Sequence, residues 1–102
     1  MARQMKAILE ELAAQAIRLG AERLEVEYKD RHEEVFAVKS GFGWGIASLR
    51  SSSPQAASLH AELYALTKKK RSMIIDNLTY DLRARIFDSF GEDAFRMELR
   101  RV

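Results

Sequence analysis

The chain has 102 residues, 47% of them hydrophobic and 31% charged, which predicts one folded domain over residues 1–102 rather than a disordered chain. Because it contains no cysteine, disulfides, thiolate metal sites and cysteine nucleophiles are excluded, and a reducing compartment, the cytoplasm, is the expected location. The 17 lysines and arginines nearly balance the 15 acids, so the total charge does not indicate a nucleic-acid-binding protein.

The first predicted element is an amphipathic helix from Ala2 to Leu19, followed by Gly20, a residue favoured just past a helix C-terminus. Its apolar residues recur at three- and four-residue spacing and therefore share one face: Met5, Ile8, Leu9, Leu12, Ala16 and Leu19. The acids within this segment distinguish it from a signal peptide. No apolar run approaches the roughly 20 residues of a membrane span, so none is expected.

Three strands are predicted next. Residues 23–30 alternate apolar and charged side chains, which is typical of a strand with one face on a core. Residues 33–40 contain the continuous apolar run Val35–Val38, which favours an inner strand covered on both faces. A third, shorter strand is expected around Trp44–Leu49.

A second helix is predicted from Pro54 to Lys69, because Ser53 can cap it and proline is tolerated at the first helical position. Beyond it, Asp76 and Asn77 suit a tight reversal between two extended runs. The last two runs, Leu82–Phe87 and Ala94–Arg101, alternate as a long antiparallel hairpin around Ser89–Asp93. The fold class is therefore α+β, with two helices and a mostly antiparallel sheet of five to six strands, in the order α-β-β-β-α-β-β-β.

The glycine-rich stretch SGFGWG, residues 40–45, is the strongest motif-like feature. A Walker phosphate loop would need Lys and Ser or Thr after the glycines, and a dinucleotide fingerprint would need G-x-G-x-x-G opening a helix. Neither spacing is present, so the stretch is interpreted as a hairpin turn. Trp44 is expected either to pack against the second helix or to stay partly exposed as a contact.

No set of side chains predicts a catalytic, cofactor-binding or metal site, and we expect no enzyme activity. His32 and His60 are interpreted as solvated surface residues, and Ser51–Ser53 as a helix cap rather than a nucleophile. The acids assigned to turns are likewise interpreted as solvated: Glu33, Glu34, Asp88, Glu92 and Asp93.

The segments, in order, resemble the N-terminal domain of the type II secretion and type IV pilus ATPases. Residues 16–41, AIRLGAERLEVEYKDRHEEVFAVKSG, are similar to its "GASD-I-H-I-E" and "V-R-Y-R-I-D-G" strands, and residues 73–101 to its closing strands. The family's "Q-D-G" loop is replaced by KKKRS, and no RecA-like domain follows, so no ATP hydrolysis of the family's kind is expected. Arg83 matches the arginine of "D-L-R", which in the family reaches a nucleotide on a neighbouring RecA domain. Arg96 lies one position before the family's later arginine.

The resemblance implies a bacterial, non-catalytic protein-interaction or regulatory domain that docks on an unidentified protein by a sheet face or edge. Pairing between copies along a strand edge stays open. Two alternatives remain, a PAS-like ligand sensor and a binder of nucleic acid or nucleotide phosphate. The sensor would need a pocket lined by Phe36, Trp44, Tyr64 and Ile86. The candidate partner or phosphate contacts are Phe42, Trp44, Lys68, Lys69, Lys70, Arg71, Arg83, Arg85 and Arg96.

Overall fold

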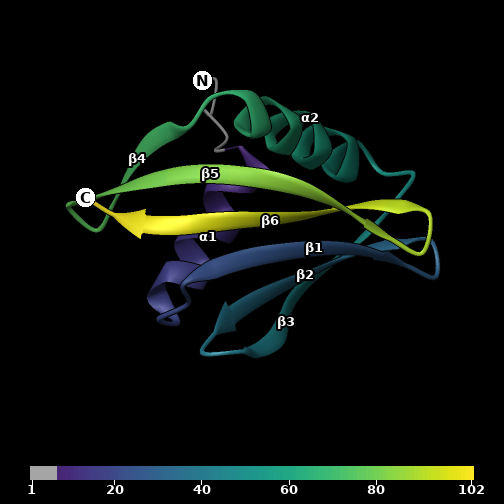
Figure 1. The fold of residues 1–102 in the computed structure, drawn as a ribbon, viewed down its shortest axis with the longest axis horizontal. Helices are drawn as coiled ribbons and strands as arrows, with labels where there is room; N and C mark the ends of the chain where they lie inside the picture. The colour runs from purple at the N-terminus through teal and green to yellow at the C-terminus, as the bar shows by residue number, and fades with distance from the viewer. Residues whose placement is uncertain (1–6) are drawn as a thin grey trace, which may run out of the picture.

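A computed structural model describes residues 7–102, and it confirms the predicted fold class and element order (Figure 1). The part of the first predicted helix that precedes Ala7, with Met5, lies outside the described residues. The elements are α1 (Ile8–Arg18), β1 (Arg23–Lys29), β2 (His32–Lys39), β3 (Phe42–Arg50), α2 (Pro54–Lys68), β4 (Arg71–Ile75), β5 (Leu78–Ser89) and β6 (Glu92–Arg101).

All the strand pairings of the six-stranded sheet are antiparallel, and its order is β3-β2-β1-β6-β5-β4. The first three strands form one meander and the last three another, and the two join where β1 pairs with β6. This junction places side chains from the two ends of the chain next to each other. The outer strands are β3 and β4.

Every hairpin in the described chain turns on two residues that both have positive φ, the backbone of a type I′ turn. The pairs are Asp30–Arg31, Ser40–Gly41, Asp76–Asn77 and Phe90–Gly91. The predicted reversal at Asp76–Asn77 is therefore confirmed. The last turn is tighter than the predicted Ser89–Asp93 loop, because Ser89 and Glu92 already pair across the hairpin.

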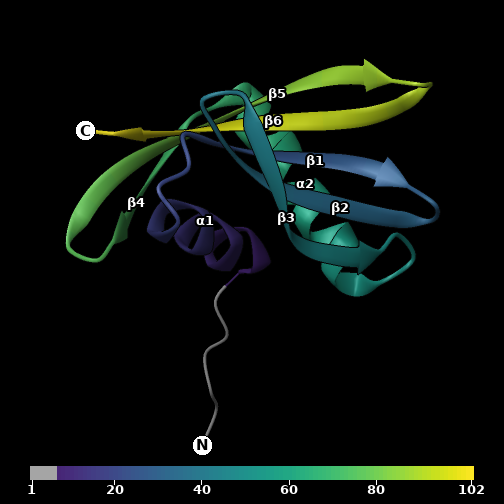
Figure 2. The same ribbon diagram turned by 90° about the horizontal axis from the view of Figure 1, so that it is seen from below.

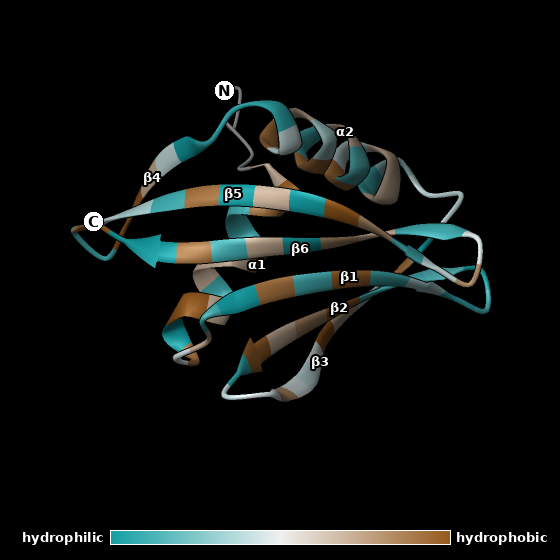
Figure 3. Ribbon diagram, in the orientation of Figure 1, coloured by the Kyte–Doolittle hydropathy of each residue, from teal (hydrophilic) through white to brown (hydrophobic). Residues whose placement is uncertain are grey.

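Both helices pack on the same face of the sheet, as Figure 2 shows. Leu9 and Leu12 of α1 and Leu59 and Leu63 of α2 are buried against inward-facing strand residues such as Leu24. Figure 3 shows the resulting alternation of hydrophobic and hydrophilic residues along β5 and β6. Neither helix of the described chain combines the length and the apolar character needed to cross a membrane.

The glycine-rich stretch is a hairpin turn followed by strand, as predicted, but the strand is longer than expected. The chain turns at Ser40–Gly41, and β3 starts at once at Phe42 and has 9 residues. The register with β2 shifts between Val35 and Phe36, so β3 holds one extra residue there, a β-bulge. The prediction of a shorter strand was wrong because residues 42–43 already pair with β2.

The second helix begins as the sequence indicates. Ser53 has extended backbone angles and its hydroxyl accepts a hydrogen bond from the Ala56 backbone N–H at 3.1 Å. Pro54 occupies the first turn, where its missing N–H is not needed. The helix ends at Lys68, one residue before the predicted end.

Candidate functional site

One face of the sheet is covered by neither helix, and we call it the open face. In Figure 1 its strands pass in front of α1. Because Leu24 and Val26 of β1 are fully buried toward the helices, the side chains between them point the other way. The register places these polar and aromatic residues on the open face: Arg23, Glu25, Glu27 and Lys29 on β1, His32, Glu34 and Phe36 on β2, Ser48 and Arg50 on β3, Ser72 on β4, Asp81, Arg83, Arg85 and Phe87 on β5, and Arg96, Glu98 and Arg100 on β6.

The register places these side chains in rows across the strands. In one row, Arg83 lies opposite Glu98, which in turn lies opposite Arg23. In the next row, Arg85 lies opposite Arg96, which lies opposite Glu25. The β1–β6 junction therefore brings Arg23 beside Glu98 and Glu25 beside Arg96.

Glu25 is the centre of the second row. Its Oε2 accepts from Nε of Arg23 at 2.7 Å and lies 3.5 Å from Nε of Arg96. The guanidinium of Arg96 also lies over the ring of Phe87, 4.7 Å from the centroid, a cation–π contact. The Glu25 carboxylate, which is largely buried, thus forms ion pairs with Arg23 and Arg96, and the ring of Phe87 packs against Arg96.

Other charges on the open face are not matched. Arg85 lies directly opposite Arg96, and Glu27 lies directly opposite Glu34, and such like-charge pairs destabilise a sheet. Among residues 7–102, Arg83 and Arg85 are exposed and form no ion pair. The buried Oε2 of Glu34 has no hydrogen-bond partner there either. The face therefore carries cations and anions that its own side chains do not neutralise.

The predicted contacts do not all lie on one surface. Arg83, Arg85 and Arg96 share the open face, whereas Trp44 lies opposite the buried Ala37 and so faces the helix side. Phe42 is two residues earlier on the same side of β3 and is 77% exposed. Trp44 is 37% exposed, so its partial exposure is as one of the two predictions has it, and its role as a contact stays a prediction. The aromatic and arginine contacts are thus on opposite faces.

The basic run after α2 is partly neutralised. Lys70 Nζ lies 3.3 Å from an Asp81 carboxylate oxygen, and an Arg71 guanidinium nitrogen lies 3.4 Å from Glu62 Oε1. Lys68 and Lys69 are exposed at the helix end. The hydroxyl of Ser72 donates to Asp81 at 2.7 Å, and with the Lys70 ammonium it holds the pKa of Asp81 below its ordinary value.

The pocket predicted for a ligand sensor is not formed. Phe36 lies opposite Glu25 and so belongs to the open face, whereas Trp44 lies on the helix side. Ile86 pairs with the buried Phe95 and also faces the helices. The sheet separates Phe36 from the other three residues. Beside Phe36, Arg23 and Arg96 the open face has a hollow of about 250 Å³.

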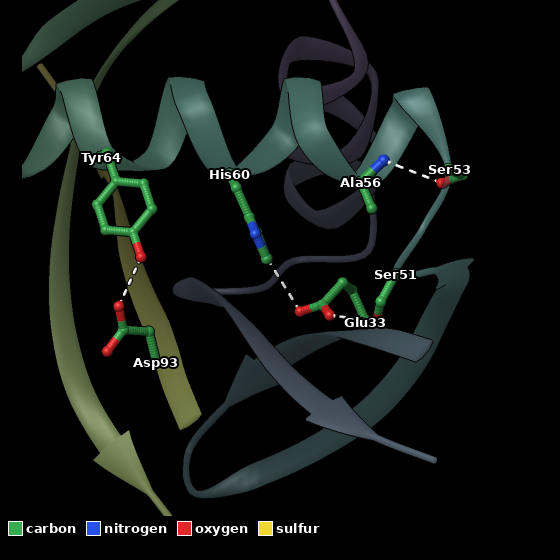
Figure 4. Close-up of polar contacts among 7 residues, drawn as sticks. All are labelled: Glu33, Ser51, Ser53, Ala56, His60, Tyr64 and Asp93. Carbon is green, nitrogen blue, oxygen red and sulfur yellow. Dashed lines mark hydrogen bonds and ion pairs between the residues drawn. The ribbon is translucent and has the colours of Figure 1, made fainter. Parts of the chain in front are cut away.

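Three residues that the sequence assigned to solvent or to a simple cap form a polar cluster around the buried Glu33 (Figure 4). Glu33 lies in β2, is 3% exposed, and accepts from the Ser51 hydroxyl at 2.5 Å. Its other carboxylate oxygen lies 2.9 Å from His60 Nε2 on α2. The solvated interpretation of Glu33 was wrong, because strand alternation places Glu33 on the same inward face as Val35. The side chain of His60 is 33% exposed, and it is bonded to Glu33 rather than solvated alone.

This cluster does not have the arrangement of a nucleophilic triad. In a triad the histidine contacts the serine and the carboxylate lies behind the histidine. Here the carboxylate of Glu33 lies between Ser51 and His60, so the Ser51 proton goes to Glu33 and not to the imidazole. The cluster ties β2, the segment after β3, and α2 together.

A second polar contact borders the first (Figure 4). The hydroxyl of Tyr64 donates to the Asp93 carboxylate at 2.5 Å, which raises the pKa of Tyr64 above its ordinary value. The Tyr64 ring packs edge-on to Phe95, with centroids 5.0 Å apart, and His60 lies 5.5 Å from the same ring. Asp93, predicted as a free turn acid, therefore fixes the orientation of an α2 side chain.

Within the described residues, no three His, Cys, Asp or Glu side chains gather in a way that could hold a metal ion. A comparison with models of known protein families gave no match for this chain. A comparison with curated proteins gave none either. The resemblance to the secretion and pilus ATPase domain therefore stays a prediction.

Proposed function

We propose that this chain is a non-catalytic protein-binding domain that docks its partner on the open face of its sheet. The observation that carries this proposal is the charge arrangement of that face. Arg83 and Arg85 are exposed without an ion pair, and Glu27 and Glu34 oppose each other across two strands. A partner with complementary charges could form ion pairs with both the arginines and the glutamates.

The kinds of side chain on the open face also favour a protein partner. Arginine and aromatic residues are enriched in protein interfaces, and here Arg96 is stacked on Phe87 while Phe36 is half-buried on β2. Rings and an arginine fixed by Glu25 lose little conformational freedom on binding.

A nucleic acid fits the open face less well. Phosphate binding needs cations that act together along a backbone, and the acids Asp81, Glu98 and Glu25 stand among the arginines. A phosphate laid across β5 and β6 would approach these carboxylates as closely as the guanidinium groups. A protein surface can place acids and bases in an alternating pattern to match.

The proposal is tested by capturing partners on the immobilised chain from a lysate of its own cells. The variant Arg83→Glu/Arg85→Glu reverses two open-face charges. The matched control, Lys68→Glu/Lys69→Glu, makes the same change in net charge at the end of α2. We expect the first variant to lose a protein that the wild type and the control retain, and the wild type to release it as salt rises.

The result against the proposal is equal capture by both variants, since open-face charge would then not matter. A wild type that captures only nucleic acid, with affinity falling steeply with salt, would support the phosphate-binding alternative instead. Circular dichroism of each variant checks that the fold is kept.

A further inference from the structure

The two edges of the sheet differ in how well they are protected from pairing with another strand. β4 has only 5 residues and begins with positive charge, Lys70 just before it and Arg71 at its first position. Short length and charge are two ways in which proteins block an edge strand. β3 has 9 residues, and no residue from Phe42 to Leu49 is charged. β3, the outermost strand at the other end of the sheet, is therefore the open edge (Figure 1).

The backbone groups at the start of this edge belong to two glycines. Lys39 and Phe42 flank the two-residue turn, so they form a hydrogen-bonded pair and the backbone of Phe42 points toward β2. Alternation then directs the N–H and C=O groups of Gly43 and Gly45 away from β2, toward the free edge. Both glycines are exposed, and neither has positive φ. A strand placed beside β3 would thus find donors and acceptors on both.

The side chains of this stretch are divided by size between the two faces. Phe42, Trp44 and Ile46 lie on the helix side, where Phe42 is 77% exposed and Ile46 packs at the margin of the core. Gly43 and Gly45 leave the other side without side chains, and a Cβ at Gly45 would contact nothing within 4 Å. The stretch FGWGI is therefore symmetric about its tryptophan: a glycine and then a large apolar residue follow in either direction.

We propose that β3 pairs with β3 of a second copy of this chain, antiparallel, about a two-fold axis that passes beside Trp44 perpendicular to the sheet. Gly43 of one copy then lies opposite Gly45 of the other, and each such pair exchanges both of its backbone hydrogen bonds. The two tryptophans face each other across the axis, and Phe42 of each copy lies opposite Ile46 of the other. The contacts recur by symmetry, so the interface is isologous.

The symmetry of FGWGI selects a second copy as the occupant. A strand that pairs with itself in the antiparallel sense needs matching residues at equal distances on either side of the axis, and this stretch has them. Cross-strand pairs of aromatic and β-branched residues stabilise antiparallel sheets, and no like charges oppose each other in this register. The edge of β3 is distinct from the open face, so this inference goes beyond the proposed docking function.

Single cysteines test the register, because the chain contains no cysteine of its own. Trp44→Cys places two thiols opposite each other in a pair whose Cα atoms are about 4.5 Å apart, within the range that a disulfide spans. Phe42→Cys is the matched control on the same side of β3 and replaces a more exposed residue. Its two copies are displaced by the distance from position 42 to position 46, about 13 Å at about 3.3 Å per residue.

Oxidation of dilute protein should therefore give a covalent dimer from Trp44→Cys and none from Phe42→Cys. An equimolar mixture of Phe42→Cys and Ile46→Cys should give a covalent heterodimer, because these two positions face each other. Cross-linking that depends on this pairing of positions is a result that misfolded protein does not give.

Proline tests the hydrogen bonds without a cross-link. Proline is tolerated in an edge strand where the N–H faces solvent, so Gly45→Pro removes a donor from the proposed interface and none from the pairing with β2. Ser48→Pro is the matched control. The bond from the Ser51 N–H to the Arg31 carbonyl shows that, past the bulge, Ser48 also points to the free edge, but it lies outside the paired stretch.

Sedimentation equilibrium should show the same dimer for the wild type and Ser48→Pro. For Gly45→Pro the dimer should be weaker by about tenfold or more, the loss expected from one or two hydrogen bonds. Circular dichroism of each variant checks that the fold is kept.

A wild type that stays monomeric at millimolar concentration overturns the inference. Equal cross-linking of Trp44→Cys and Phe42→Cys, or equal dimerisation of the two proline variants, also overturns it. Arg83→Glu/Arg85→Glu should dimerise as the wild type does, and loss of the dimer in this variant would place the interface on the open face instead. The capture experiment tests the docking function separately, so either proposal can fail while the other stands.

Discussion

The three adjacent serines before α2 allow a sharp test of the packing, because the same substitution should have three different costs. Ser51 donates to the carboxylate of Glu33, Ser52 is exposed, and Ser53 caps the helix. Ser51→Ala removes one hydrogen-bond donor from the carboxylate of Glu33, a residue that is only 3% exposed. The loss of a hydrogen bond to a buried charged group should lower the free energy of unfolding by about 2 kcal/mol.

The other two costs follow from the same structure. Removal of the Ser53 cap should lower the free energy of unfolding by about 1 kcal/mol. The exposed Ser52 serves as the matched control, and its replacement should change this free energy by less than about 0.5 kcal/mol. Urea titration at pH 7, monitored by circular dichroism, measures the change in free energy of unfolding for each of the three variants. The dependence of that free energy on urea concentration should be the same for all of them.

A second substitution checks that charge is the cause. In a Glu33→Gln background the acceptor is neutral, so the cost of Ser51→Ala should fall to about half, because charge-assisted hydrogen bonds are roughly twice as strong as neutral ones. Equal costs for Ser51→Ala and Ser52→Ala, or an unchanged cost in the Glu33→Gln background, would refute the buried cluster.

Three further outcomes are expected from single contacts. The hydrogen bond from Ser72 is the main cause of the depressed pKa of Asp81. The ionised carboxylate therefore stabilises the fold above its ordinary pKa of about 3.9, and this stabilisation is lost as the pH falls through the lower pKa of the folded state. Thermal melts should show that the wild type loses more stability below pH 4 than Asp81→Asn does. The hydrogen bond that Tyr64 donates to Asp93 raises the pKa of Tyr64, so this bond stabilises the fold below pH 10 and the stabilisation is lost as the pH rises through the folded pKa. Tyr64→Phe should lower the free energy of unfolding by less than about 1 kcal/mol at pH 7. In thermal melts, this variant should lose less stability at alkaline pH than the wild type. Phe95→Ala, at a fully buried ring, should lower the free energy of unfolding by about 3–5 kcal/mol in urea titration.

Much of the fold could be predicted because its signals are local. The alternation in residues 23–29 and 94–101 defines two strands, and Asp76–Asn77 is a pair that adopts positive φ readily. Ser53 and Pro54 mark the start of α2 to the residue. Each of these features depends on the conformational preferences of neighbouring residues alone.

The candidate site could be predicted only in part, because it depends on which strands pair. The sequence identified Arg83, Arg85 and Arg96, but their neighbours Glu25 and Glu98 come together only through the pairing of β1 with β6. More than sixty residues separate these two strands along the chain, and alternation does not encode such a pairing. Of the acids on β1 and β2 that face outward, Glu34 was therefore taken as an ordinary solvated residue.

Buried polar groups were missed for a similar reason. Two acids, Glu33 and Glu34, follow one another in a polar stretch, and composition favours a turn there. The β1–β2 turn is in fact complete at Asp30–Arg31, so strand alternation already applies and sends Glu33 inward and Glu34 outward. His60 then finds Glu33 only because α2 lies over β2.

The claim that the open face is the docking surface is tested most directly by site-specific photo-crosslinking in the cells that make this protein. A photoreactive residue replaces either Arg85 on the open face or Ala57 on the exposed side of α2, and mass spectrometry identifies each adduct. Specific adducts should form from position 85 and not from position 57. Adducts from position 57 alone, or none from position 85, would contradict the claim.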